Sequence, residues 1–326
     1  MSERYNVLVT LPVEERHKEL LAGNAPHADF TYCLNADLNK DMVQNAEVIV
    51  GNVPIDMLKG TDKLKWLQLN SAGTDGYTAD GVLPKGAVLT NATGAYGLAI
   101  SEHMLGALLC MMKKLYLYED DQRNHIWSDH GHVTSIWGSK TLVVGFGNIG
   151  CEFAMKMHAL GSSVTGIRRT QAEKPEYLEG LYQMDKLKEC LKDADIVATC
   201  LPGTKETYKV FDKEAFAAMK PGAFFINVGR GNAVDSDALA DALNSGHLGG
   251  ASIDVTDPEP LPKDHPLWDA KNLLITPHVS GFYHLPETFE KIIRITARNF
   301  DNYEHGRTLE NEVDFATGYR KSEQTI

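Results

Sequence analysis

TLVVGFGNIGCEFAMKMHALG, residues 141–161, decides the fold. It begins as an apolar strand, passes through three glycines at GxGxxG spacing and ends with the apolar spacing of an amphipathic helix. The first glycine permits a tight turn, the second lets the backbone approach a pyrophosphate, and the third lets helix pack on strand. The helix would point its free N–H groups at phosphate oxygens. The stretch therefore predicts a dinucleotide site, with candidate residues Gly145, Gly147, Asn148, Ile149 and Gly150.

Short apolar runs alternate with helical patterns on both sides of this stretch, which is typical of parallel sheets covered by helices. The predicted strands cover residues 7–11, 29–34, 47–51, 64–71, 87–91, 140–147, 163–169, 195–202, 223–229, 249–255 and 272–278. The predicted helices include residues 14–22, 97–118, 148–160, 236–244 and 286–303. A chain of 326 residues is long enough for two such domains.

Two arginines follow the second strand of the dinucleotide motif, in TGIRRT at residues 165–170. An acid that binds the adenosine ribose is expected about 20 residues after the glycines. Arginine reverses that preference, because its guanidinium binds a phosphate bidentately. We interpret Arg168 and Arg169 as the site of a 2′-phosphate and predict that NADPH is preferred over NADH, which would still be accepted. The alternative is a solvated pair that tolerates either cofactor.

The composition excludes several classes of protein. It is 43% hydrophobic and 23% charged, as in ordinary globular proteins, and the net charge of −12 argues against a nucleic-acid partner. The five cysteines include no CxxC pair or zinc-like cluster, which indicates reduced thiols and no metal site. The N-terminus has no signal-like apolar core, and the longest apolar helical stretch, residues 104–112, is too short for a membrane span. We expect a cytoplasmic protein with no membrane association.

Three further stretches place titratable residues at the carboxyl ends of predicted strands, where open α/β sheets bind ligands. They are NVGRG (227–231), DVTDPEPLP (254–262) and TPHVSG (276–281). Taken singly, Arg230 also fits a surface ion pair, Glu259 a solvated loop carboxylate and His278 a core histidine with its hydrogen bonds satisfied.

The order of these motifs resembles that of the D-2-hydroxyacid dehydrogenases, NAD(P)-dependent enzymes that include glyoxylate/hydroxypyruvate reductases and D-lactate dehydrogenases. Five motifs match at the family's spacings: GFGNIG (145–150), CLPGTKET (200–207), INVGRGNAVDSDAL (226–239), SIDVTDPEPLP (252–262) and ITPHVSG (275–281). LQLNSAGTDGY (67–77) and NATGAYGLAISEHMLGALL (91–109) match more loosely. The resemblance thus spans nearly the whole chain.

The resemblance implies a two-domain architecture. Residues 1–97 and 284–326 would form a flavodoxin-like substrate-binding (catalytic) domain, and residues 98–283 a dinucleotide-binding Rossmann domain, with the active site in the cleft between them. It also implies a homodimer formed through the 97–139 region, in which the helix at 97–118 and the loop from Trp127 to Trp137 act as a dimerisation arm. An ordinary core helix is the alternative.

The resemblance also assigns the chemistry. His278 would be the general acid that protonates the carbonyl oxygen during reduction, and Glu259 would pair with it and favour the imidazolium. Arg230 would hold the substrate carboxylate and polarise the carbonyl. Formate dehydrogenases of this fold have glutamine in place of Glu259, so the acid favours proton-coupled 2-oxo acid chemistry.

The remaining site residues come from the same resemblance. Further cofactor candidates are Leu201, Pro202, Thr207, Val228, Gly229 and Asp254, the last near the nicotinamide carboxamide, with Arg230 and His278 beside them. Ala72 and Gly73 lie in a loop whose backbone would bind the substrate carboxylate.

The substrate pocket is less defined by the sequence. After TPHVSG most relatives continue with small residues, but this chain has FYHLP at residues 282–286. Tyr283 in this segment, together with Val53, Pro54 and Tyr96, could shape the pocket around the substrate side chain. The same residues could equally be hinge packing.

The sequence therefore predicts an NADPH-preferring oxidoreductase acting on the CH–OH group of D-2-hydroxy acids, which reduces a small 2-oxo acid. A D-3-phosphoglycerate dehydrogenase is one alternative. A nucleotide-sensing binding protein of the co-repressor type is another, because such relatives also keep the three catalytic residues.

Overall fold

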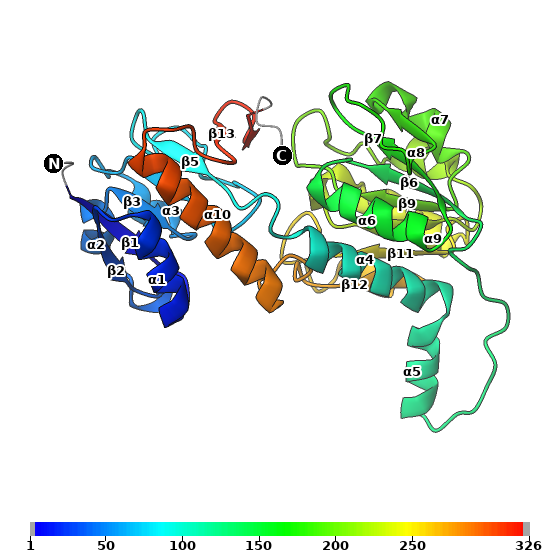
Figure 1. The fold of residues 1–326 in the computed structure, drawn as a ribbon. Coiled ribbons are helices and arrows are strands. Elements are labelled where there is room, and N and C mark those ends of the chain that lie inside the picture. Colours follow the sequence, from blue (N-terminus) through cyan, green and yellow to red (C-terminus); the bar gives the residue numbers. More distant parts are fainter. Residues whose placement is uncertain (1–3, 322–326) are drawn as a thin grey trace. The chain divides into compact units, whose positions relative to one another are not determined.

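A computed structural model describes residues 4–321 of the chain (Figure 1). The chain divides into two compact units, one formed by Met1–Tyr96 with Tyr283–Ile326 (unit 1) and the other by Gly97–Phe282 (unit 2). The extreme ends of the predicted substrate-binding domain, residues 1–3 and 322–326, lie outside the described residues.

Unit 1 is built on a five-stranded parallel sheet with the order β2-β1-β3-β4-β5. This order is that of flavodoxin-like folds, so the predicted class is confirmed. The strands are β1 (Tyr5–Val9), β2 (Ala28–Tyr32), β3 (Val48–Val50), β4 (Trp66–Gln68) and β5 (Val88–Thr90). The helices are α1 (Glu15–Asn24), α2 (Lys40–Asn45), α3 (Ile55–Leu58) and α10 (Pro286–Glu304), and a hairpin of β13 (Val313–Asp314) and β14 (Tyr319–Arg320) follows α10.

The fully buried Trp66 of β4 joins α10 to this sheet. Its ring packs edge-on against Phe300 of α10, with 5.1 Å between centroids, and its indole N–H donates to the Thr90 hydroxyl at 2.7 Å. Because the apolar body and the polar tip of the tryptophan are both satisfied, this contact holds the last long helix on the first sheet.

Unit 2 contains a seven-stranded parallel sheet with the order β12-β11-β10-β9-β6-β7-β8. Counted from β6, this is the Rossmann order 3-2-1-4-5-6 with one more strand, so the second predicted fold is also confirmed. The strands are β6 (Lys140–Val144), β7 (Ser163–Ile167), β8 (Gly180–Tyr182), β9 (Ile196–Thr199), β10 (Phe224–Asn227), β11 (Gly250–Ile253) and β12 (Leu273–Ile275). The helices are α4 (Gly97–Met112), α5 (Leu115–Arg123), α6 (Asn148–Ala159), α7 (Leu187–Leu191), α8 (Lys213–Ala218) and α9 (Ser236–Asn244).

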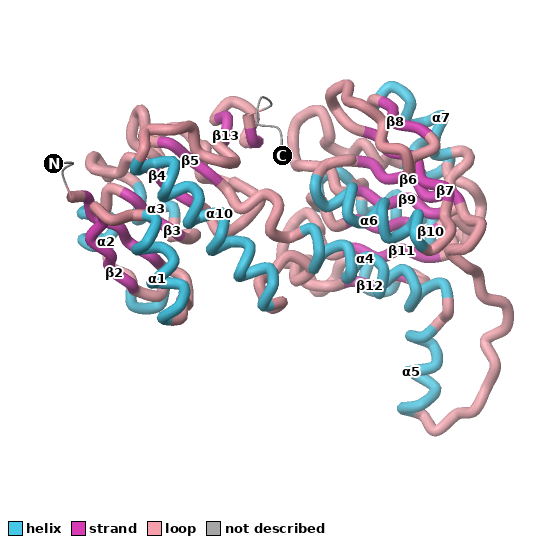
Figure 2. The backbone as a smooth tube through the Cα atoms, viewed as in Figure 1, coloured by secondary structure: helices cyan, strands magenta, loops and turns pink. Residues whose placement is uncertain are grey.

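Helices cover both faces of this second sheet, as the tube view shows (Figure 2). Helices α4 and α6 pack against each other, α6 on β6 and β7 and α4 on β10 and β11. Helices α7, α8 and α9 share an apolar core with the inner strands, which includes Phe216, Phe225 and Leu239. All the predicted strands form, whereas the short edge strand β8 was not predicted from the sequence.

The helix predicted over residues 97–118 is wrong in one respect, because the structure has two helices there. The helix is interrupted at Lys114, whose φ of 57° lies in the left-handed region that ends a right-handed helix. Lys114 donates a hydrogen bond to the carbonyl of His130 in the following loop. The second helix, α5, therefore points away from the sheet of unit 2, and the chain returns from it in a long loop (Figure 1).

Over residues 4–321, no helix is both long enough and apolar enough to cross a bilayer.

Candidate active site

The glycine-rich turn joins β6 to α6 at the point where the strand order of unit 2 reverses. Gly145 has a φ of 95°, and a Cβ at this position would lie 2.8 Å from the Cys200 carbonyl oxygen. A Cβ at Gly150 would lie 2.5 Å from the Gly145 carbonyl oxygen, so α6 starts in close contact with the turn. Both glycines therefore keep the turn tight.

The N-terminus of α6 is open to a ligand. Gly147 occupies the N-cap, and no side chain caps the helix. A Cβ at Gly147 would meet nothing within 4 Å. The first N–H groups of the helix, from Asn148 onward, have no intrahelical partner, and there is open space beside the Gly147 Cα. This arrangement fits the pyrophosphate of a dinucleotide.

Arg168 follows β7 and lines a pocket of about 320 Å³ between the ends of β7 and β8. Its backbone N–H donates to Tyr182, and its guanidinium lies 3.5 Å from the Thr170 hydroxyl. The pocket is also lined by Gln171, Ala172, Leu181, Gln183, Asp185 and Lys186. Arg169 is exposed and does not line this pocket; its carbonyl accepts from the Gln183 amide.

Arg230 lies in a turn held by the buried side chain of Asn227, the last residue of β10. The Asn227 amide accepts from the Gly229 N–H at 3.0 Å and donates to the Arg230 carbonyl at 3.2 Å. A Cβ at Gly231 would lie 2.0 Å from the Thr256 carbonyl, so this turn directly touches the loop that carries Glu259.

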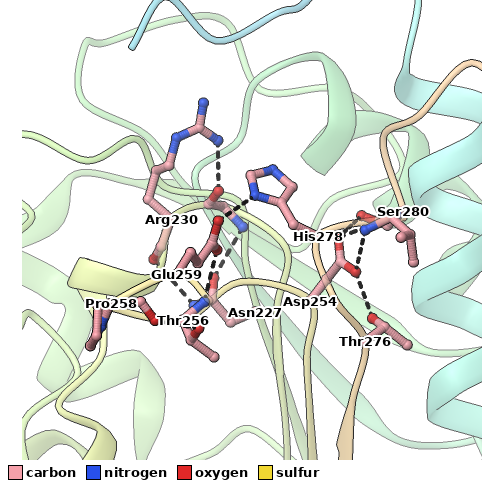
Figure 3. Close-up of polar contacts among 11 residues, drawn as sticks. Asn227, Arg230, Asp254, Thr256, Pro258, Glu259, Thr276, His278 and Ser280 are labelled. Carbon is pink, nitrogen blue, oxygen red and sulfur yellow. Dashed lines mark hydrogen bonds and ion pairs between the residues drawn. The ribbon is translucent and has the colours of Figure 1, made fainter. Parts of the chain in front are cut away.

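His278 and Glu259 form a direct pair beside Arg230 (Figure 3). The His278 Nδ1 lies 2.8 Å from Glu259 Oε2, and the other carboxylate oxygen accepts from the Thr256 N–H at 3.0 Å. Because an ionised carboxylate only accepts, His278 donates from Nδ1, and its Nε2 takes no part in this bond. The two side chains are 47% and 39% exposed, so the pair is accessible from outside.

Asp254 follows β11 and is buried, with 2% of its surface exposed. Its Oδ1 accepts from the Thr276 hydroxyl at 2.6 Å and the Val279 N–H at 3.0 Å. Its Oδ2 accepts from the N–H and the hydroxyl of Ser280. Both carboxylate oxygens are therefore used to hold the turn that contains His278 (Figure 3).

The backbone of Asp254 completes this arrangement. Its N–H donates to the Asn227 carbonyl, and its own carbonyl accepts from the His278 N–H at 2.7 Å. His278 has a φ of 53°, in the left-handed region that few residues other than glycine occupy. Such a conformation costs of order 1–3 kcal/mol and persists where neighbouring contacts enforce it.

In unit 1, the loop after β4 offers backbone donors. Its carbonyls are occupied: those of Ser71, Ala72 and Gly73 accept from the Ala92 N–H, the Asn91 amide and the Ser71 hydroxyl, respectively. In the part of the chain that the structure describes, the N–H groups of Ala72, Gly73 and Thr74 donate to no acceptor. This geometry suits the capture of an anion.

The other substrate candidates in unit 1 are well packed. Val53 is fully buried in the core, and its carbonyl accepts from the Tyr77 hydroxyl at 2.8 Å. Burial raises the pKa of Tyr96 above its ordinary value, and the hydroxyl donates to the Asn70 carbonyl. Tyr283 packs against Phe289 of α10, with 5.5 Å between ring centroids.

The remaining cofactor candidates lie at the ends of β9 and β10. The Thr207 hydroxyl donates to the Pro202 carbonyl, which closes the 202–207 loop on itself. A Cβ at Gly229 would lie 2.3 Å from the Leu201 carbonyl oxygen, so the turn before Arg230 packs tightly on this loop. Val228, which precedes Gly229, is buried, with 7% of its surface exposed.

Several residues that hold the site together had no role predicted from the sequence. Asn227 and Gly231 fix the turn with Arg230, and Thr276 and Ser280 bind Asp254. A signal was present, since each is a polar or small residue that lies at, or within two residues of, the carboxyl end of a predicted strand. The partners of Gly231, Thr276 and Ser280 could not be identified from the sequence, because they follow another strand.

A comparison with protein families matches residues 105–280 to the NAD binding domain of the D-isomer specific 2-hydroxyacid dehydrogenases. The match lies within unit 2 and contains the glycine-rich turn and the residues from Arg230 to His278. This chain belongs to that family. It is therefore an NAD(P)-dependent oxidoreductase of 2-hydroxy acids, as the motifs predicted.

Known members of the family match this 2-hydroxyacid dehydrogenase over most of its length. It is 31% identical to glyoxylate/hydroxypyruvate reductase B of Pectobacterium carotovorum, over 76% of this chain and 79% of that one. A crystal structure of a D-isomer specific 2-hydroxyacid dehydrogenase family protein from Aeromonas salmonicida is 32% identical, with a TM-score of 0.85 and coverage of 96% and 100%. A D-isomer specific 2-hydroxyacid dehydrogenase from Xanthobacter autotrophicus, solved with NADPH and MES, is 27% identical, with a TM-score of 0.80 and coverage of 97% and 100%.

The two glycines of the dinucleotide turn should respond differently to alanine. In Gly147→Ala the methyl group meets no protein atom, so the melting temperature should stay within about 2 °C. It would occupy the space of the pyrophosphate, however, and weaken dinucleotide binding roughly tenfold or more. Gly150→Ala should lower both stability and binding, because its methyl group overlaps the Gly145 carbonyl.

Thermal unfolding and fluorescence titration with NADPH measure the two effects. Gly23→Ala, which also meets nothing within 4 Å, is the control in unit 1: it should leave NADPH binding unchanged and should not lower the melting temperature, because alanine is favoured over glycine in helix α1. Unweakened binding by Gly147→Ala would contradict a pyrophosphate at this turn.

Proposed function

We propose that this 2-hydroxyacid dehydrogenase is an NADPH-preferring reductase of small 2-oxo acids that forms D-2-hydroxy acids, with His278 as the general acid. The observation that carries the proposal is the bond between His278 Nδ1 and Glu259, at 2.8 Å. Because this bond uses Nδ1, Nε2 points away from the carboxylate and is the atom that would exchange a proton. The His278 side chain lies beside Arg230 (Figure 3).

When bound, the nicotinamide cofactor would supply the hydride for reduction of the keto carbon. His278 delivers its Nε2 proton to the carbonyl oxygen, and Glu259 stabilises the imidazolium before the transfer. Arg230 attracts the substrate carboxylate and the negative charge that develops on the carbonyl oxygen. The role of the Ala72 and Gly73 N–H groups of unit 1 as donors to a substrate carboxylate stays a prediction.

A panel of 2-oxo acids tests the proposal. Glyoxylate, hydroxypyruvate, pyruvate, larger apolar 2-oxo acids and 3-phosphohydroxypyruvate are each assayed with NADPH and with NADH. We expect rapid NADPH oxidation with at least one unphosphorylated acid and, where the product has a stereocentre, the D configuration. Turnover of the phosphorylated acid alone would favour a phosphoglycerate dehydrogenase, and cofactor binding without any turnover would favour a nucleotide sensor.

The role of His278 predicts a specific loss of activity. In His278→Asn the asparagine accepts the left-handed backbone but cannot donate a proton at neutral pH. Turnover should therefore fall about a hundredfold or more, with little change in the affinity for NADPH. The matched control is His305→Asn, because His305 also faces a carboxylate, that of Asp301 at 3.2 Å. Near-normal turnover by His278→Asn in steady-state assays would refute the assignment.

The preference for NADPH is assigned to Arg168 and Arg169. It is supported by the pocket beside Arg168, which Lys186 and Thr170 also line. Loss of a hydrogen bond to a charged group costs about 1.5–3 kcal/mol, so Arg168→Ala should raise the KM for NADPH roughly tenfold or more. The KM for NADH should change little, because NADH carries no 2′-phosphate.

Steady-state assays with both cofactors measure this change, and Arg169→Ala apportions it between the two arginines. Equal losses for NADPH and NADH would show that Arg168 does not distinguish the cofactors.

The proposal includes a homodimer formed through the 97–139 region. Large apolar side chains are exposed along α5 and the loop after it: Leu115, Ile126, Trp127, Val133 and Trp137. Such an apolar surface on a projecting arm is typical of an interaction site. A cytoplasmic location is also proposed, on the basis of five cysteines that are all free thiols.

Trp127, which is fully exposed, provides the test of the dimer. Trp127→Asp should place a charge in the interface and shift the mass measured by analytical ultracentrifugation toward that of a monomer at micromolar concentration. Trp268→Asp changes an exposed tryptophan outside the arm and should leave the mass unchanged. An unaltered dimer in the Trp127→Asp variant would argue against this interface, and a monomeric wild-type protein would refute it.

A further inference from the structure

A half-buried histidine on α4 contacts the hydrogen-bond network of the active site. Along α4, the buried residues Ile100, Met104 and Ala107 form the stripe that faces the unit 2 sheet, and His103 lies at the edge of this stripe. Its Nε2 is 3.3 Å from the Thr276 hydroxyl oxygen. His103 is thus positioned by a helix that is distant in sequence from the other site residues.

The direction of this hydrogen bond follows from the donors available. The Thr276 hydroxyl has one proton, and it donates that proton to Asp254 Oδ1 at 2.6 Å. Asp254 cannot be the donor, because its two carboxylate oxygens already accept from Thr276, Val279 and Ser280. The Thr276 oxygen is therefore an acceptor toward His103, and His103 carries a proton on Nε2.

The result is a continuous chain of donors, from His103 Nε2 through the Thr276 hydroxyl to Asp254. Because the oxygen of Thr276 accepts from His103, its proton is directed at Asp254 and the hydroxyl cannot rotate away. Hydrogen bonds in such a chain polarise and strengthen one another. Asp254 in turn accepts from the N–H groups of Val279 and Ser280, on the turn that holds His278 in its left-handed conformation.

We propose that His103 is a positioning residue of the reaction, which fixes the turn of His278 through Thr276 and Asp254. It touches neither the proton-transferring nitrogen nor Glu259, so its contribution is to the orientation of His278. The catalytic part of this inference rests on the proposed function, whereas the effect on the turn does not.

The test substitutions change the two donors that lead to Asp254, His103 and Thr276. His103→Leu removes the donor at similar size, and His103→Gln keeps an N–H group that can reach Thr276. Thr276→Val removes the hydroxyl and keeps the shape of the side chain. Glu102→Gln is the control on the same helix, because Glu102 is exposed and has no role in the site.

The first measurement is amide hydrogen exchange of the segment 276–282, which needs no substrate. We expect exchange at Val279 and Ser280 to be at least about tenfold faster in His103→Leu and Thr276→Val, with the glycine-rich turn unaffected. His103→Gln should restore most of the protection. Unchanged exchange in both His103→Leu and Thr276→Val would overturn the proposal, even if the chain had no 2-oxo acid reductase activity.

The second measurement is steady-state turnover with the 2-oxo acid that works best in the panel. Misplacement of His278 should lower kcat about ten- to a hundredfold while the KM for NADPH stays near its wild-type value. The His103→Leu/Thr276→Val double variant should be no slower than the slower single variant, because both substitutions break the same chain of hydrogen bonds. Multiplicative losses, or a kcat in His103→Gln as low as in His103→Leu, would overturn the proposal.

Discussion

The candidate active site of this 2-hydroxyacid dehydrogenase depends on one buried carboxylate, that of Asp254. Removing an isolated charge from water is very costly, and Asp254 is almost completely buried. Four hydrogen bonds to its two oxygens offset that cost, and all come from the segment between Thr276 and Ser280. The charge is stable only while this turn keeps its shape. The turn, equally, keeps its shape because its donors form hydrogen bonds with the Asp254 carboxylate.

A second set of hydrogen bonds holds the end of the neighbouring strand, β10, in the same way. The buried amide of Asn227 fixes the turn that presents Arg230, and the carbonyl of Asn227 receives the N–H of Asp254. Hydrogen bonds thus join the end of β10 to that of β11, and the end of β11 to that of β12. The buried polar groups that form them have few other hydrogen-bond partners. We infer that the proposed acid–base pair, His278 and Glu259, and Arg230 are held as one rigid group, which is the condition for preorganised catalysis.

The sequence was a good guide to features that local patterns control. The β6–α6 stretch shows its strand, turn and helix in consecutive residues, and the predicted strands of both sheets form. It was a poor guide where distant residues decide. The three-residue strand β8 forms because it pairs with β7, and the predicted helix breaks at Lys114, where the chain is left-handed and Lys114 bonds to the loop at His130.

The same distinction applies to the site. His278 and Glu259 stood out by type and by motif, and so did Asp254. The partners of Asp254 and the place of His103 did not, because 151 residues separate His103 from Asp254 and no local pattern links them. A sequence motif marks the residues whose chemistry is constrained. The residues that orient them are recognised from hydrogen bonds in three dimensions.

The left-handed backbone at His278 restricts the choice of residue there in two ways at once. Steric repulsion removes β-branched and bulky side chains and leaves glycine, asparagine, aspartate and histidine as the residues that enter this region most readily. Among those four, only histidine exchanges a proton near neutral pH without a special environment. Conformation and chemistry therefore select the same amino acid, and a substitution at this position has to satisfy both the backbone of the turn and the proton transfer.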